Sequence, residues 1–482
     1  MRTLTRDTLK KVGESVTLMG WVHIRRDHGK LIFIDLRDRW GIVQVVFSPK
    51  DKALLKQADR LRPEWVVKVV GFVKERPKGM ANPEFITGTV EVEATELEIL
   101  EEAKTSPFQL DTEGYEIGEE HRLTYRYLDL RRERLKNNLL MRDKVIAFIR
   151  DWLHKEDRDF VEVETPILTK STPEGARDYV VPSRLYPGKF YALPQSPQQY
   201  KQLLMVAGME RYFQIARCFR DEDTRGDRQP EFTQLDLEMS FASQNDILKL
   251  TEDLFTTLVK ELYPQKKFAT PFKRMTYEHA MTEYKTEKPD LRENKDDPNE
   301  LAFAFIYAFP MFEKKDDGSL GAVHHPFTLP SFTGDDNYED YARDRQIARD
   351  MHTRLRSGNK EEILKTKAFQ YDFVCNGYEI GGGSLRTHDP AMLKSVFIAL
   401  GHDQVEIEKK FSHILQAFQY GVPPHGGIAP GIDRLLMILQ GEPNIREVIA
   451  FPKTGDARDL MMDAPSELEK KQLGELHLKI TE

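Results

Sequence analysis

RCFRDEDTRGDRQPEFTQLDLEMSF, at residues 217–241, carries the clearest structural pattern in this chain. Apolar residues precede it and then alternate through its second half, namely Tyr212, Phe213, Ile215, Leu235, Leu237, Met239 and Phe241. A polar loop rich in Arg, Asp and Glu, with one glycine, separates the two apolar stretches. The pattern predicts a hairpin of two long strands with a charged tip.

The other positions of the second strand carry mostly polar side chains beside one aromatic ring. They are Phe232, Thr233, Gln234, Asp236 and Glu238. A strand face that meets only solvent has no need of the phenylalanine at its start. The combination therefore indicates the floor of a ligand-binding sheet.

Length and composition limit the class of protein. A chain of 482 residues exceeds what one hydrophobic core usually supports, so we expect two or more domains. The composition is 40% hydrophobic and 31% charged, which is ordinary for a soluble globular protein. The net charge of -8 argues against a general polyanion binder but leaves local basic patches open.

No segment indicates secretion, membrane insertion or a disulfide framework. Cys218 and Cys375 lie in apolar runs, without a CxxC pattern or a nearby histidine, and are interpreted as reduced buried residues. The N-terminal sequence MRTLTRDTLKK lacks the apolar core of a signal peptide. The longest apolar run, residues 301–312, is too short to cross a bilayer. The sequence thus predicts a soluble, cytoplasmic protein.

Residues 1–104 read as a small all-β domain. Five β-rich runs and one short helical segment, residues 51–60, fit a closed barrel of the OB type. The outward positions combine aromatic and basic residues: Trp21, His23, Arg25, Arg26, His28, Phe33 and Gln44. Such a face can stack bases and meet phosphates, which favours single-stranded nucleic acid, although a plain barrel with ordinary surface charge explains it equally well.

Residues 105–137 have few periodic apolar residues and are interpreted as a hinge or connector. An amphipathic helix follows, with Val145, Phe148, Ile149, Trp152 and Leu153 at helical spacing, and then the strand-like run FVEVETPIL. Residues 138–482 mix strands and helices without βαβ regularity and lack both GxGxxG and GxxxxGK[ST]. We expect an α+β domain built on an antiparallel sheet, with residues 334–360 as a helical surface insertion.

Two further segments carry matching chemistry. GGIAPGIDRLLMILQG, residues 426–441, leads through glycines into a helix whose first turn bears Asp433 and Arg434. YDFVCNGYEIGGGSLR, residues 371–386, places Asp372 and Glu379 on one predicted strand, a good arrangement for Mg²⁺ when phosphates complete the ligand set. Taken singly, a triple glycine is usually a bulge or turn, and a helix arginine is usually a surface cation.

With these segments together, the chain resembles the class II aminoacyl-tRNA synthetases, and more narrowly the bacterial-type aspartyl-tRNA synthetases. Residues 142–166, 217–241 and 431–434 are similar to motifs 1, 2 and 3 of the class. Four further strings are typical of the aspartate enzymes: TPEGARDY at 172–179, QSPQQYKQ at 195–202, HHPFT at 324–328 and GGGSLR at 381–386. The resemblance implies a ligase that activates L-aspartate with ATP and transfers it to tRNA-Asp.

The resemblance also assigns roles by position. Arg220 and Arg434 would be catalytic, and Asp372 and Glu379 would hold Mg²⁺. The aspartate pocket would contain Glu174, Gln198, Lys201, Arg220, Asp236, His324 and Arg386. The ATP site would contain Arg220, Asp221, Glu222, Gln229, Phe232, Glu379, Gly431, Ile432, Asp433 and Arg434. Arg26, His28, Phe33 and Gln44 would contact the anticodon, and motif 1 would form a homodimer.

Two departures from the family pattern matter. The large domain that bacterial members insert in the catalytic half is missing near residues 292–300, where only ENKDDPNE stands. In addition, His28 stands where strictly tRNA-Asp-specific members often have leucine, which favours a relaxed enzyme that also charges tRNA-Asn. Whether the domain loss is natural or engineered stays open.

Three other functions compete with this interpretation. An asparaginyl- or lysyl-tRNA synthetase is the nearest rival, but Arg386 and the Lys201–Asp236 pair argue against it. A catalytically dead paralogue that serves as an RNA-binding or regulatory module usually loses a motif 2 or motif 3 arginine, whereas Arg220 and Arg434 are both present. An amide ligase of the same catalytic fold would lack the N-terminal barrel.

Overall fold

The computed structural model describes residues 1–171, 176–334 and 345–481. It divides into two compact units, residues 1–118 and residues 119–482. The division falls inside the stretch 105–137 that the sequence marks as a connector, and the second half of that stretch folds with the larger unit.

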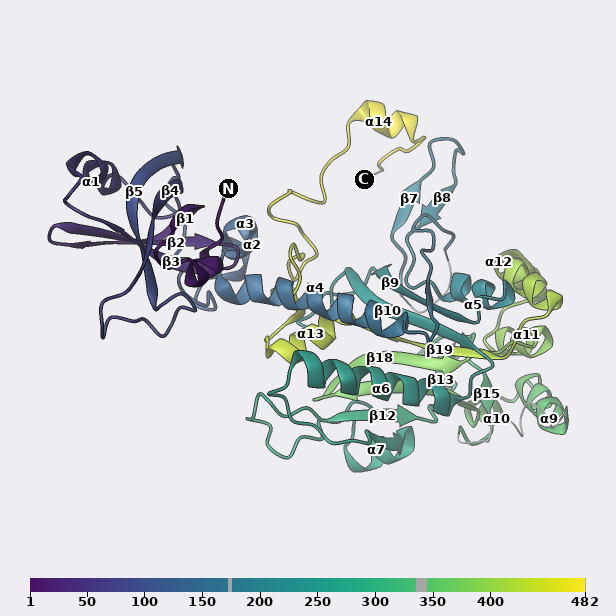
Figure 1. The fold of residues 1–482 in the computed structure, drawn as a ribbon. Helices are drawn as coiled ribbons and strands as arrows, with labels where there is room; N and C mark the ends of the chain where they lie inside the picture. Colours follow the sequence, from purple (N-terminus) through teal and green to yellow (C-terminus); the bar gives the residue numbers. More distant parts are fainter. Residues whose placement is uncertain (172–175, 335–344, 482) are drawn as a thin grey trace. The chain divides into compact units, whose positions relative to one another are not determined.

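The first unit is a closed barrel of five strands in the order β1-β2-β3-β5-β4 (Figure 1). Its elements are η1 Thr5–Lys10, β1 Ser15–His28, β2 Leu31–Asp38, β3 Gly41–Phe47, α1 Lys52–Asp59, β4 Val66–Glu75 and β5 Val90–Glu101. All neighbours pair antiparallel except β3 and β5, which are parallel. Alternate residues of each strand fill the interior, as period-2 patterning requires, so the expected OB-type barrel is confirmed.

The second unit is built on one sheet of eight strands in the order β11-β12-β17-β18-β19-β10-β9-β6. The strands are β6 Val161–Glu162, β9 Arg211–Phe219, β10 Glu231–Ser240, β11 Lys273–Thr276, β12 Phe303–Tyr307, β17 Gln370–Cys375, β18 Tyr378–Leu385 and β19 His425–Pro430. The α+β class is confirmed. The sheet is antiparallel in its middle, but the edge pairs β11–β12 and β6–β9 are parallel, so it is mixed rather than wholly antiparallel.

Three helices cover one face of this sheet: α4 Glu133–Leu153, α6 Gln244–Leu262 and α13 Ile432–Gln440 (Figure 1). Val145, Ile149, Trp152 and Leu153 of α4 are buried in the main core, as the helical spacing predicts. The run after α4 that was expected to be a long strand pairs only at Val161–Glu162. Pro166 removes a donor soon afterwards, which limits how far the strand can extend.

Shorter elements surround the sheet. They are α2 Glu119–Thr124, α3 Arg126–Asp129, β7 Val180–Pro182, β8 Phe190–Ala192, α5 Gln198–Val206, α7 Tyr277–Glu283, β13 Phe312–Lys314, β14 Leu320–Ala322, β15 Pro330–Ser331, α9 Arg345–Leu355, α10 Lys360–Leu364, β16 Lys367–Ala368, α11 Pro390–Ala399, α12 Gln404–Ala417, η2 Phe418–Tyr420, η3 Ile445–Glu447 and α14 Lys470–Glu475. Helix α9 lies in the predicted insertion 334–360. Among the described residues, no helix is long and apolar enough to cross a membrane.

The predicted hairpin is confirmed as β9 and β10, which pair antiparallel with Leu235 opposite Ile215. Two details differ from the sequence interpretation. Thr233 lies on the face away from the cavity described below, where its hydroxyl contacts Arg142 and Arg217. Phe241 lies beyond the strand end with a φ of 58° and is 69% exposed, so it does not continue the buried alternation.

Candidate active site

A cavity of about 430 Å³ lies over the face of the central sheet that bears Phe232, Gln234 and Asp236. Its walls come from the β9–β10 loop, α5, residues 323–325, β18 and the start of α13. Segments more than 200 residues apart in the sequence therefore meet around one space. The triple glycine belongs to strand β18 rather than to a turn.

Four buried charged residues at one end of the cavity are here called the cavity cluster: Lys201, Asp236 and Arg386, which border the cavity, and Glu238, which contacts Lys201 and Arg386. Lys201 Nζ lies 3.1 Å from the Asp236 carboxylate and 3.3 Å from that of Glu238. Arg386 donates from Nε and Nη2 to the two oxygens of Glu238, at 2.9 and 3.1 Å. Two positive and two negative side chains thus compensate one another, as buried charges require.

Local structure explains how these four residues meet. Asp236 and Glu238 are two positions apart on β10 and therefore share a face of the sheet. Lys201 contacts both of them from the first turn of α5. Gly427 on the paired strand β19 leaves room for Glu238, because a Cβ there would lie 2.2 Å from Glu238 Oε2. A side chain at position 427 would force the Glu238 carboxylate away from Arg386.

The two carboxyls of the cavity cluster differ in acidity. Burial opposes ionisation of Glu238, but the charges of Arg386 and Lys201 and the Arg386 hydrogen bonds outweigh it and lower its pKa to about 2. Burial raises the pKa of Asp236 above its ordinary value, against the opposing charge of Lys201. Glu238 is therefore the firmly ionised partner of the pair.

Neutral histidines line the same end. His325 Nε2 accepts a hydrogen bond from Arg386 Nη1 at 2.9 Å, which leaves the ring proton on Nδ1. Burial, together with the charge of Arg386, lowers the pKa of His325 well below 6.5, and burial lowers the pKa of His324. His324 Nε2, His325 Nδ1 and Gln370 Oε1 are buried without a hydrogen-bond partner among the described residues. Unpaired buried polar atoms are costly, and a polar ligand would satisfy them.

The other end of the cavity is formed by the β9–β10 loop and α13. The Arg220 guanidinium lies 5.1 Å from the centre of the Phe232 ring. Arg434 donates from Nε to the carbonyl oxygen of Asp227 at 3.1 Å and from Nη1 to that of Glu379 at 2.8 Å. Two guanidinium groups and one aromatic face therefore border the same space.

The carboxylate of Asp433 ties together the three segments that resemble motifs 1, 2 and 3. Its Oδ2 accepts from the backbone N–H of Thr233 at 2.8 Å, and its Oδ1 accepts from Arg142 Nη1. Arg142 Nη2 then donates to Thr233 Oγ1 at 2.9 Å, which closes the ring of contacts. Although Asp433 borders the cavity, its carboxylate is committed to this junction.

Asp372 and Glu379 lie on adjacent strands, β17 and β18, so the prediction that one strand carries both is wrong. The residues between them, Asn376 and Gly377, have positive φ and turn the chain. A Cβ at Gly382 would lie 3.0 Å from Asp372 Oδ1 and 3.9 Å from Glu379 Oε1, so both carboxylates approach this glycine. Burial and the charge of Glu379 raise the pKa of Asp372 well above its ordinary value.

Most of the predicted site residues border the cavity: Gln198, Lys201, Arg220, Glu222, Gln229, Phe232, Asp236, His324, Glu379, Arg386, Gly431, Asp433 and Arg434. Three do not. Asp221 pairs with Arg177 outside the cavity, Ile432 is buried in the apolar core, and Asp372 lies behind Gly382. Glu174 lies outside the described residues.

Sequence reasoning missed three residues that the structure brings to the cavity: Asp227, His325 and Gln370. Glu238 is already indicated by the sequence as part of the sheet floor, and the structure adds its ion pair with Arg386. Asp227 and Gln370 had no sequence signal, since their positions depend on how the loop and strand β17 fold back over the sheet.

In the first unit, the residues predicted to face nucleic acid lie together on β1, β2 and β3. Arg26 donates from Nη1 and Nη2 to Asp35 at 2.8 and 2.7 Å, and Gln44 donates to Glu91 at 2.9 Å. The His28 and Phe33 rings meet edge to face, with centroids 5.5 Å apart. The barrel therefore places aromatic rings beside polar side chains that its own acidic residues orient.

Two family models match the chain. Residues 118–455 match "tRNA synthetases class II (D, K and N)", and residues 16–100 match "OB-fold nucleic acid binding domain". These ranges correspond to the two structural units.

Curated relatives match over almost the whole chain. An aspartate–tRNA(Asp/Asn) ligase of Rubrobacter xylanophilus is 43% identical, with 99% of this chain and 97% of the relative covered. One of Dehalococcoides mccartyi is 41% identical, with 98% of both covered. The first alignment runs over 605 positions against the 482 residues of this chain, so the relative contains a long stretch without a counterpart here.

Solved structures agree in fold. Asparaginyl-tRNA synthetase from Pyrococcus horikoshii, complexed with asparaginyl-adenylate, superimposes with a TM-score of 0.69 at 24% identity, covering 92% of this chain and 96% of that one. Aspartyl-tRNA synthetase from Entamoeba histolytica gives 0.70 at 21% identity, covering 94% and 91%.

Proposed function

The chain belongs to the class II tRNA synthetases of the D, K and N group and, within that group, to the aspartate–tRNA ligases; on this premise we propose how its cavity performs the two steps. In the first step the α-carboxylate of L-aspartate attacks the α-phosphorus of ATP, which gives aspartyl-adenylate and releases pyrophosphate. In the second step a hydroxyl of the terminal ribose of tRNA attacks the aspartyl carbonyl of the adenylate, which forms the ester and releases AMP. The cavity cluster beside the two-arginine end is the observation that carries the proposal.

The cavity cluster forms the pocket for the aspartate side chain. Lys201 has three N–H donors and two acidic neighbours, so one donor stays available to a substrate. Arg386 Nη1 donates to the neutral ring of His325, an acceptor that a substrate carboxylate would displace with a gain in charge-assisted bonding. Asparagine would present an amide N–H₂ to these donors, and mismatches of this kind reduce the rate about 10⁴-fold.

The opposite end takes ATP. Arg220 would meet the α-phosphate and the substrate carboxylate, and its contact with Phe232 holds the guanidinium at the start of β10. Arg434 would meet the γ-phosphate, with Asp227 and Glu379 fixing its plane. Glu222 and Gln229 border the same loop. Charge that develops on phosphate oxygens would thus meet preorganised cations, which is the main source of catalysis when no side-chain nucleophile is needed.

The acidic pair fits Mg²⁺. Asp372 and Glu379 repel one another without a cation, and Gln370 Oε1 is a buried oxygen without a partner nearby. Hard oxygen ligands of this kind suit Mg²⁺ when phosphates complete its octahedron. Bound there, the ion would neutralise phosphate charge. Glu379 borders the cavity and Asp372 supports it from behind Gly382.

The barrel reads the anticodon in this proposal. Arg26 would meet a phosphate, Phe33 would stack on a base and Gln44 would hydrogen-bond to it. His28 beside Phe33 supports charging of tRNA-Asn as well as tRNA-Asp, as the names of the relatives indicate for those proteins. We further propose a cytoplasmic homodimer formed through residues 142–166, and activity without the insertion domain.

ATP–pyrophosphate exchange with aspartate, asparagine and lysine tests the first step. We expect exchange with aspartate alone, followed by charging of tRNA-Asp. Exchange that prefers asparagine or lysine would contradict the pocket assignment. A chain that binds tRNA without any exchange would instead be a non-catalytic RNA-binding paralogue.

A further inference from the structure

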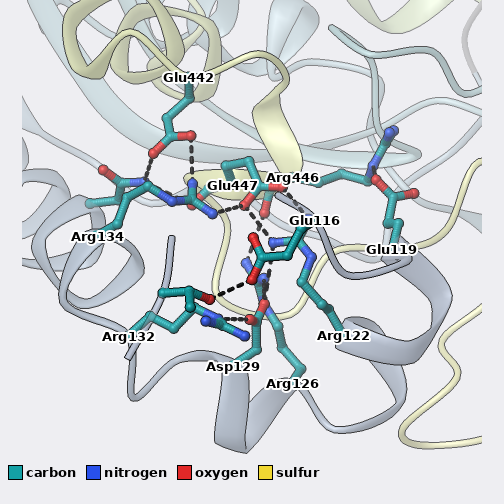
Figure 2. Close-up of polar contacts among 12 residues, drawn as sticks. Glu116, Glu119, Arg122, Arg126, Asp129, Arg132, Arg134, Glu442, Arg446 and Glu447 are labelled. Carbon is teal, nitrogen blue, oxygen red and sulfur yellow. Dashed lines mark hydrogen bonds and ion pairs between the residues drawn. The ribbon is translucent and has the colours of Figure 1, made fainter. Parts of the chain in front are cut away.

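A second group of charged residues, all buried except the partly exposed Arg134, lies in the larger unit outside the cavity (Figure 2). It joins α2, α3 and the start of α4 to the residues after α13. We call it the arginine cluster: Arg122, Arg126, Asp129, Arg132, Arg134, Glu442 and Glu447. Glu447 accepts two bonds from Arg122, at 2.7 and 3.1 Å, and one from Arg134 at 3.0 Å.

Arg126 donates hydrogen bonds to three backbone carbonyl oxygens beside this cluster. Its Nη2 donates to the carbonyl oxygens of Arg446 and Ile449, both at 2.9 Å, and its Nε donates to that of Ala450 at 3.0 Å. Its Nη1 is paired with Asp129 at 2.8 Å, and the residue is only 3% exposed. One planar guanidinium therefore fixes the turn at 446–450, a task that a lysine cannot reproduce.

The turn at 446–450 belongs to residues 442–455, which we call the brace segment because they are hydrogen-bonded to the β9–β10 loop. Ile445 N donates to the carbonyl oxygen of Gly226 at 2.9 Å. The Gln229 side chain exchanges two bonds with the backbone of Lys453, at 2.7 and 3.1 Å. The Thr224 hydroxyl bonds to the carbonyl oxygen of Gly455. Both halves of the loop are thereby attached to the brace segment.

Ile445 of the brace segment borders the cavity together with side chains from one short stretch of the loop: Glu222, Asp223, Asp227, Arg228 and Gln229. The aspartate end is built differently, from α5, β10 and β18. A shift of the brace segment would therefore move the nucleotide end of the cavity and leave the aspartate end in place.

We infer that Arg126 is a positioning residue for the ATP subsite, acting through the brace segment on the β9–β10 loop. This inference rests on the proposed function, since it places ATP at the loop end of the cavity. Displacements of about 1 Å away from reacting groups can reduce rates about 100-fold. The bonds from Arg126 to three backbone carbonyls therefore determine how the loop binds and orients ATP.

The test is ATP–pyrophosphate exchange with the variant Arg126→Lys, which keeps the positive charge but loses the planar guanidinium and its several directed N–H donors. We expect the KM for ATP to rise about tenfold while the KM for aspartate changes less than about twofold. Hydrogen exchange should become faster at the amides of residues 222–229 before it changes in β10. Arg292→Lys is the control away from the brace segment, because Arg292 likewise pairs with an aspartate, Asp290, and donates to a backbone carbonyl, that of Lys295.

A second variant, Thr224→Val, breaks the loop side of the same path and leaves the buried cluster intact, so the inference stays testable if Arg126→Lys fails to fold. It should raise the KM for ATP selectively, and the double variant should show less than the product of the single effects. Unchanged KM for ATP in a folded Arg126→Lys, or equal rises for both substrates, overturns the inference alone. Absence of aspartate-dependent exchange in the unaltered chain overturns the proposed function as well.

Discussion

The cavity cluster and the arginine cluster contain the same chemistry, buried guanidinium and carboxylate groups in short contact, but they are completed differently. In the arginine cluster the carboxylates of Glu442 and Glu447 are each bonded to two or more side chains of the protein. The cavity cluster borders an open space and adjoins unpaired atoms of His324, His325 and Gln370.

The difference shows what separates a binding site from a structural ion network. Burial and the number of charges do not distinguish the two, because both clusters are buried and both contain acids and bases. An adjoining cavity and neutral histidines next to a cation do, since they represent hydrogen-bonding capacity that faces an open space. An unpaired atom alone does not, because Arg122 Nε of the arginine cluster is also buried without a partner among the described residues.

The largest expected effect comes from removing one arginine from each cluster. Arg386→Leu should abolish aspartate-dependent exchange, with a loss of at least ~1000-fold in kcat/KM, because the substrate carboxylate loses its donors. Arg134→Leu should lower the free energy of unfolding by about 3 kcal/mol, since it breaks buried pairs with Glu442 and Glu447, while the KM for aspartate stays within about twofold.

Exchange kinetics and urea unfolding measure the two quantities. Arg386→Lys serves as a second variant if the leucine variant does not fold. Ordinary exchange by folded Arg386→Leu would place the aspartate pocket elsewhere.

The two clusters should also lose stability in different pH windows. His425 lies behind the cavity cluster, and burial lowers its pKa from 6.5 to about 4. The folded protein accommodates only the neutral imidazole. The free energy of unfolding is therefore highest above pH 6.5 and decreases by about 3 kcal/mol as the pH falls to 4. Burial opposes ionisation of Glu447, but Arg122, Arg134 and Arg126 lower its pKa from 4.5 to about 2. The stability that ionised Glu447 provides is therefore lost only as the pH falls from 4.5 to about 2.

Urea unfolding at fixed protein concentration between pH 7 and 5 separates the two windows. His425→Gln should flatten the pH dependence in this range, whereas Glu447→Gln should leave the slope as it is. Equal slopes in the unaltered chain and in His425→Gln would show that the pKa of this histidine is the same in the native and unfolded states.

The acidic pair provides an intermediate case between the two clusters, because only one of its members borders the cavity. Glu379→Gln should raise the Mg²⁺ concentration for half-maximal exchange about tenfold, as loss of a ligand or its support commonly does. Asp372→Asn should raise it about twofold, since Asp372 acts from behind Gly382. Titration of exchange with Mg²⁺ measures both, and the reverse order would make Asp372 the direct ligand.

The smallest effect is expected on the barrel. Arg26 resembles the arginine cluster, with both Nη atoms on Asp35, whereas His28 is held by a ring contact with Phe33. His28→Leu should reduce charging of tRNA-Asn relative to tRNA-Asp by about tenfold, equivalent to about 1.4 kcal/mol. Charging of the two tRNAs by one preparation measures the ratio. An unaltered ratio would show that His28 does not take part in discrimination.

Much of the fold was predictable from local patterns. Period 2 in β10 and helical spacing in α4 reflect burial of one face, which sequence records directly. The short β6 and the parallel edge strands were not predictable, because they depend on which strands meet in the finished sheet.

The candidate site divides in the same way. Lys201, Asp236 and Arg386 were found through the family resemblance, and the structure brings them together. The sequence suggested one strand for Asp372 and Glu379 because the tight turn at Asn376 and Gly377 is too short to stand out between two apolar runs. The brace segment had no sequence signal, since its contacts are largely to backbone carbonyls, which every residue carries.

The junction at Asp433 has a consequence for how this gene could exchange segments with distant relatives. Arg142, Thr233 and Asp433 lie far apart along the coding sequence, yet each contacts the other two. A recombination crossover between any two of these positions would bring residues from different parent proteins into direct contact. In a shuffled library, surviving chimeras should therefore inherit all three positions from a single parent, or from parents that agree there.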